Sequence, residues 1–138
     1  MIVLDTNVLS ELIRPIPAPA VVAWLQDQPR TGLFTTTISR GEMLLGVWSL
    51  PEGQRRRLLN DHVRAIFDQD MAGRILSFDA NAADAFAAIT VERRTQGRPI
   101  SQFDAMIAGI ARSRGARLAT RNVRDFEGCG ITMMDPWA

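Results

Sequence analysis

The 138-residue sequence predicts an α/β fold, with a mostly parallel central sheet of about five strands and helices on both sides. Short runs of apolar and β-branched residues alternate along the chain with longer segments whose apolar residues recur at helical spacing. The first run, residues 2–4, is apolar at every position, which is typical of a strand buried on both faces of a parallel sheet. No repeat, low-complexity segment or linker interrupts the alternation, so residues 1–138 are expected to form one domain.

In the first half of the chain, prolines and turn residues separate the predicted elements. The predicted helices cover residues 8–14, 19–27, 37–48 and 55–69, and the second strand covers residues 33–36. A turn at Pro51 and Gly53 joins the last two helices, so they are expected to form an antiparallel hairpin. Ser39 and Glu42 have capping-box spacing, three residues apart, at the start of this hairpin.

The second half repeats the alternation. Strands are predicted over residues 74–78, 117–120 and 131–134, and helices over residues 81–96 and 101–115. Gly97 and Gly115 are expected to end the two helices, and Ser101 with Asp104 gives a second capping-box spacing.

Composition narrows the class of protein. The single cysteine, Cys129, excludes an internal disulfide and suits a reducing compartment. No secretory signal or apolar run of membrane-spanning length is present, so we expect a cytoplasmic protein that does not contact a membrane. The one histidine, His62, excludes a two-histidine acid–base mechanism.

Basic residues are unevenly distributed. The formal net charge is only +1, but residues 93–124 hold eight arginines and a single acid, Asp104. This local excess favours a polyanionic partner such as nucleic acid. All sixteen basic residues are arginine, whose planar fork suits phosphate oxygens.

Acidic side chains follow several predicted strands or begin predicted helices. They are Asp5, Glu42, Asp104 and the turn that contains Asn122 and Asp125. In a parallel sheet these positions lie at one edge, so the carboxylates are expected to converge. Mg²⁺ or Mn²⁺ is the usual partner of such an all-oxygen site, where it orients water toward a phosphodiester. Helix capping explains Asp5, Glu42 and Asp104 equally well from the pattern alone.

Four stretches in order along the chain resemble the motifs of PIN-domain ribonucleases of the VapC/FitB toxin type. They are Met1–Glu11, Ile38–Val47, Phe103–Ala108, and Ala119–Phe126 together with Asp135–Trp137. The resemblance spans essentially the whole chain, and the FitB-like branch is the most similar. It implies a PIN domain over residues 1–138 that acts as a Mg²⁺- or Mn²⁺-dependent endoribonuclease on structured RNA such as tRNA. It also implies a cognate antitoxin, and a homodimer or a hetero-oligomer with that antitoxin.

The resemblance also assigns the acids. Asp5, Glu42 and Asp104 match the metal-binding residues of the family. Many relatives have Asp where this chain has Asn122, and others have Asn there with an acid three residues later. Asp125 is therefore expected to supply the missing charge, directly or through water.

Further residues are expected around these acids. Thr6 and Thr120 resemble hydroxyls that hydrogen-bond the site in the family, and Asn7 is expected to orient Asp5. Three arginines in or beside the motifs are candidates for holding RNA phosphates or an acidic segment of the antitoxin; solvated surface arginines explain each of them equally well. They are Arg40, Arg121 and Arg124.

Two rival functions stay open from the sequence. A phosphatase or DNA nuclease could use a similar acid cluster, although Asp5-Thr6-Asn7 lacks the Asp-x-Asp of haloacid-dehalogenase phosphatases. A catalytically silent domain that binds RNA or a partner is the other rival, and Asn122 is the feature that keeps it open.

Overall fold

A five-stranded parallel sheet forms the centre of the computed structural model, which describes residues 1–138. Its strands are β1 (Ile2–Leu4), β2 (Leu33–Thr36), β3 (Ile75–Leu76), β4 (Arg117–Ala119) and β5 (Met133–Met134). The strand order is β3-β2-β1-β4-β5, and every neighbouring pair is parallel. The predicted fold class is therefore confirmed, with β1 as the central strand.

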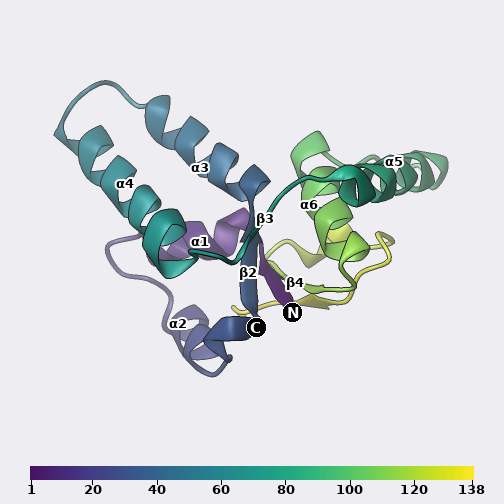
Figure 1. Cartoon of the computed structure of the whole chain (residues 1–138), viewed down its shortest axis with the longest axis horizontal. Coiled ribbons are helices and arrows are strands. Elements are labelled where there is room, and N and C mark those ends of the chain that lie inside the picture. Colours follow the sequence, from purple (N-terminus) through teal and green to yellow (C-terminus); the bar gives the residue numbers. More distant parts are fainter.

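Six α-helices and three short turns of helix surround the sheet (Figure 1). The helices are α1 (Thr6–Leu12), α2 (Pro19–Gln26), α3 (Thr37–Trp48), α4 (Gln54–Ala65), α5 (Ala80–Thr95) and α6 (Gln102–Ser113). The short turns are η1 (Arg30–Gly32), a single π-helical turn η2 (Ile66–Asp70) and η3 (Val123–Phe126). None of the helices is long and apolar enough to cross a membrane.

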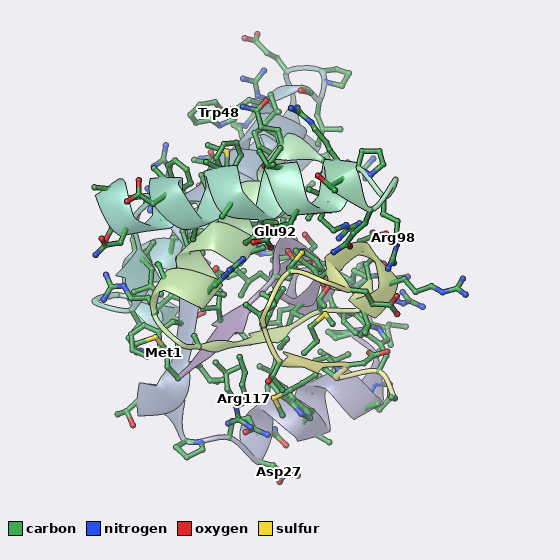
Figure 2. All side chains as sticks on the ribbon, turned by 90° about the vertical axis from the view of Figure 1, so that its right-hand side faces the viewer. Met1, Asp27, Trp48, Glu92, Arg98 and Arg117 are labelled. Carbon is green, nitrogen blue, oxygen red and sulfur yellow. The ribbon has the colours of Figure 1, made fainter.

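Successive residues of β1 point into different halves of the core. Ile2 and Leu4 pack with α1 to α4, whereas Val3 packs with α5 and α6. This alternation follows from the pleat of a strand that is covered on both faces. Figure 1 shows α1, α2 and α4 on one side of the sheet and α5 and α6 on the other. Figure 2 looks onto the α5 and α6 side and places Trp48 far from the sheet, at the end of α3.

Several predicted boundaries were wrong. The strand predicted over residues 74–78 is only Ile75–Leu76, because β3 is an edge strand that pairs with β2 alone. The strand predicted over 131–134 begins at Met133. The helix predicted over 55–69 ends at Ala65 and continues as the π-helical turn.

The N-cap of α3 also differs from its prediction. Thr36, not Ser39, is the N-cap, and its hydroxyl accepts a hydrogen bond of 3.0 Å from the Ser39 amide. Ser39 is therefore inside the helix and fully buried. Glu42, which the predicted capping box would have used at the helix start, is left available for another role.

Candidate active site

A cleft of about 380 Å³ lies at the carboxyl edge of the sheet and brings distant acids together. Asp5, directly after β1, lies in its wall with Glu42 of α3 and Asp104 of α6. The remaining wall residues are Thr6, Asn7, Ser10, Glu11, Arg14, Arg121, Asn122 and Trp137. Parallel strands place their carboxyl ends at one edge, which explains why three residues so far apart in sequence share one cleft.

Asp5 is both a helix cap and a cleft residue. Its Oδ1 accepts a 2.8 Å hydrogen bond from the Thr6 amide at the start of α1, and its Oδ2 accepts one of 2.8 Å from the Thr120 hydroxyl. The residue is only 4% exposed. Burial raises the pKa of Asp5 from 3.8 to about 6; the two hydrogen bonds oppose this shift, and the charges of Asp104 and Glu42 add to it.

Glu42 is held by a chain of hydroxyl groups. The Thr6 hydroxyl lies 2.8 Å from Glu42 Oε1 and 2.8 Å from Ser39 Oγ. Because this hydroxyl has one hydrogen, it donates to the carboxylate and accepts from Ser39, which in turn accepts from Thr36. Burial raises the pKa of Glu42, the Thr6 hydroxyl lowers it, and the charge of Asp104 raises it.

Asp104 lies in the first turn of α6, as its spacing from Ser101 predicted. The Ser101 hydroxyl is the N-cap and accepts a 3.3 Å hydrogen bond from the Asp104 amide. Burial raises the pKa of the Asp104 carboxyl; the hydroxyl of Ser101 lowers it, and the charge of Asp125 raises it. The three acids are therefore close enough for their charges to act on one another.

Asn122 and Asp125 occupy different positions relative to the cleft. Asn122 lies in the cleft wall, and its backbone N–H donates a 3.0 Å hydrogen bond to the Thr120 hydroxyl. Asp125 is in η3, outside the wall, and acts on the cleft through its charge on Asp104. Asn7 links the two ends of the chain, because its side-chain amide lies 3.4 Å from both the Thr120 hydroxyl and the Arg121 amide.

Only one of the three candidate arginines lies in the cleft wall. Arg121 does, and its guanidinium carbon is 5.2 Å from the centre of the Trp137 ring. Arg40 is directed elsewhere: it forms a 2.8 Å ion pair with Asp68 and lies over Phe67. Arg124 is exposed on η3, outside the wall. Arg40 and Arg124 therefore lie outside the cleft wall, and their contact with RNA phosphates or an antitoxin stays a prediction.

Four wall residues were missed by the assignment from sequence: Ser10, Glu11, Arg14 and Trp137. A signal for Glu11 was present, since it follows Asn7 by four residues and so lies on the same face of α1. No comparable pattern points to Trp137, which reaches the cleft only because β5 lies beside β4.

The donors of the cleft suit a hard divalent cation. Three carboxylates with raised pKa values, partly or fully buried, face one another with hydroxyl groups around them, and oxygen is the ligand that Mg²⁺ and Mn²⁺ prefer. No three acidic, histidine or cysteine side chains converge within ligating distance of one point. A divalent ion in this cleft would therefore contact some of the acids through its own water molecules.

Comparison with known proteins gives the family. Residues 2–128 match the PIN domain. The chain belongs to the PIN-domain family. This PIN domain is 36% identical over 137 residues to the VapC ribonuclease Y4jK of Sinorhizobium fredii, covering 99% of the chain and 98% of that protein. It is 35% identical over 137 residues to the toxin FitB of Neisseria gonorrhoeae, covering 99% of each.

A solved structure agrees with this placement. The PIN domain superposes on a chain in the structure of FitAB bound to the IR36 DNA fragment with a TM-score of 0.92 and 36% identity. The match covers 100% of this chain and 96% of that chain. The resemblance seen in the four sequence motifs is thus confirmed over the whole fold.

Proposed function

We propose that this PIN domain is a Mg²⁺- or Mn²⁺-dependent endoribonuclease and the toxin of a toxin–antitoxin pair. The observation that carries the proposal is the cleft in which Asp5, Glu42 and Asp104 are brought together and held by hydroxyl and amide donors. The names of the VapC and FitB relatives support the same reaction and the same biological role.

The chain's own residues position the acids for this reaction. Thr120 and the Thr6 amide fix both oxygens of Asp5, and the Thr6 hydroxyl fixes one oxygen of Glu42. Arg121 is the cation of the wall that is placed to hold a phosphate of the RNA. A divalent ion held among the three carboxylates, partly through its own water molecules, would orient water toward the phosphodiester and stabilise the leaving oxygen.

A cognate antitoxin is the proposed protein partner in the cytoplasm. Three large apolar side chains are exposed on α3 and α4, namely Leu45, Trp48 and Leu58. Exposed apolar residues gathered on one hairpin suit a protein interface. They support a homodimer or a hetero-oligomer with the antitoxin.

The test is cleavage of total tRNA and rRNA by the purified chain in Mg²⁺, in Mn²⁺ and in EDTA, with Asp104→Asn alongside. We expect cutting in at least one metal, none in EDTA and a loss of at least ~100-fold in the variant. Single-stranded DNA offered in parallel tests the rival DNA nuclease. Cutting that persists in both Asp5→Asn and Asp104→Asn would contradict the assignment.

A silent RNA- or partner-binding domain is the second candidate, and the amide of Asn122 in the cleft wall is the observation that favours it. Calorimetric titration with Mg²⁺ separates the two functions. A nuclease site binds the ion in a manner that Asp104→Asn weakens, whereas a domain whose acids only cap helices shows no such binding.

A further inference from the structure

Glu11 is the one residue whose buried side chain has a polar atom without a hydrogen-bond partner. The residue is 3% exposed, and its Oε2 is unpartnered. Its other oxygen, Oε1, accepts a long hydrogen bond of 3.4 Å from Arg14, whose side chain is 64% exposed. A buried carboxylate whose single partner is weak and lies at the surface lowers the stability of the fold, because its interactions do not offset the free energy of removing its charge from water.

The position of Glu11 in the cleft indicates which ligand this oxygen could bind. Glu11 lies in the wall of the same cleft as Asp5, Glu42 and Asp104, although it was not among the acids assigned from sequence. With Arg14 and Arg121 as the basic residues of the wall, four carboxylates face two guanidinium groups. The cleft is therefore short of positive charge on the side of α1 as well as at the carboxyl edge of the sheet.

The chemistry of this oxygen restricts its ligand. It requires a hydrogen-bond donor or a cation, no donor of the chain reaches it, and RNA phosphate would be repelled. A divalent ion that keeps its water molecules offers O–H donors and positive charge together. We infer that Glu11 is an additional positioning residue of the cleft, whose Oε2 accepts hydrogen bonds from the hydration water of the cation held by Asp5, Glu42 and Asp104.

This inference rests on the proposed divalent-ion site, and its first test measures ion binding without RNA. Mn²⁺ affinity is measured by electron paramagnetic resonance for the whole chain and for Glu11→Gln, which keeps the size and one acceptor of the side chain. The variant is expected to bind Mn²⁺ roughly 10-fold more weakly. Unchanged affinity in Glu11→Gln, or no Mn²⁺ binding by the unmodified chain, would overturn the inference.

Two control variants separate the cleft from general charge effects. Glu92→Gln removes a carboxylate of α5 that lies outside the cleft wall and pairs with Arg112, and it should leave Mn²⁺ affinity unchanged. Arg14→Ala removes the cleft residue that pairs with Glu11 and should increase the affinity, since a competing positive charge is lost. Weaker binding in Arg14→Ala would indicate that the ion pair itself is what matters and would overturn the inference.

Thermal unfolding distinguishes a positioning role from a structural one. In EDTA, Glu11→Gln should unfold at the same temperature as the unmodified chain or a few degrees higher, because a poorly compensated buried charge is removed. Mn²⁺ should then raise its unfolding temperature less than that of the unmodified chain. A lower unfolding temperature in EDTA with an unchanged Mn²⁺ increment would identify Glu11 as merely structural.

The outcomes for Glu11 and for RNA cleavage can be told apart. Weakened Mn²⁺ binding in Glu11→Gln supports the inference even if no RNA is cut, in which case only the proposed activity fails. Metal-dependent cutting with equal Mn²⁺ affinity in Glu11→Gln overturns the inference and leaves the proposed activity intact.

Discussion

Asp5 shows at the level of one residue how the fold prepares a site for a cation. Its side chain is buried at the carboxyl end of β1, next to Asp104 and Glu42. Ionisation of the Asp5 carboxyl is therefore opposed by desolvation and by the negative charges of these two acids. The hydrogen bonds from Thr6 and Thr120 recover only part of this cost. A bound divalent ion would recover the rest, so ion binding and stability are expected to be linked.

The pH dependence of stability follows from this shift. Because the pKa of Asp5 is about 6 in the folded chain and 3.8 as its ordinary value, the folded chain binds the additional proton between those values. The free energy of unfolding in EDTA should therefore fall as pH rises from about 4 to 6, by up to about 3 kcal/mol for this group. Denaturant unfolding of the chain and of Asp5→Asn across this range measures the effect. The Asn variant should show a flatter profile, and an equally steep one would contradict the assignment.

Thr120 gives a second prediction at the residue scale. Its hydroxyl donates a hydrogen bond to the Asp5 carboxylate and accepts one from the backbone N–H of Asn122. Thr120→Val therefore leaves both groups without this partner. We expect a 10- to 100-fold loss of Mn²⁺ affinity, of the order seen when residues that orient metal ligands are changed. Thr120→Ser keeps the hydroxyl and should restore most of the affinity. Equal loss in both variants would point to packing instead of the hydrogen bond.

Helix α6 shows how an element delivers a functional residue. It carries Asp104 in its first turn, and it packs so closely on α5 that Gly109 meets the backbone of that helix. A Cβ on Gly109 would lie 2.7 Å from the Ala82 carbonyl oxygen and 2.9 Å from the Phe86 nitrogen. The contact is between backbones, so it cannot be relieved by a side-chain rotation.

Gly109→Ala is therefore expected to separate α5 from α6 and to cost about 1–3 kcal/mol of unfolding free energy. Gly46→Ala in α3 is the matched control, since a Cβ there meets nothing within 4 Å and alanine favours helix by up to about 1 kcal/mol. Denaturant unfolding should thus give changes of opposite sign. Destabilisation by both substitutions would show that the close approach is not the cause.

At the scale of the whole molecule, the basic segment is less available to RNA than its sequence predicts. Arg93 is buried and donates to backbone carbonyls of Asp125 and Glu127. Three more arginines of the segment form ion pairs with acids beyond its ends: Arg98 with Glu127, Arg112 with Glu92, and Arg114 with Asp79. Figure 2 shows Glu92 and Arg98 on the side of α5 and α6. Half of the eight arginines are therefore already occupied.

The salt dependence of RNA binding tests this occupancy. Arg94, Arg117, Arg121 and Arg124 are the exposed arginines of the segment that form no ion pair. With about four phosphate contacts to single-stranded RNA, log K should fall against log salt with a slope no steeper than about −3. The measurement uses Asp104→Asn and an RNA oligonucleotide that it does not cut. A slope near −5 would mean that further arginines, either the paired ones or those outside the segment, also bind phosphate.

The sequence by itself determined the order of strands and helices and the parallel sheet, and it predicted that Asp5, Glu42 and Asp104 would lie at one edge of that sheet. These features follow from local patterns, namely apolar runs, helical spacing and acids placed after strands. The N-cap of α3 was predicted wrongly because Thr36 and Ser39 are both good caps, and only the path of β2 decides which of them is the cap. The ends of β3 and β5 likewise depend on pairing with a neighbouring strand.

Only the tertiary structure decided which side chains meet in the cleft. Thr120 reaches Asp5 because β4 pairs with β1, and Arg40 is drawn away because α4 and η2 place Asp68 and Phe67 beside it. The burial of Glu11 and its unpartnered oxygen became visible only in the tertiary structure. A local pattern fixes the face on which a side chain lies, whereas burial and partners are set by segments that are distant in sequence.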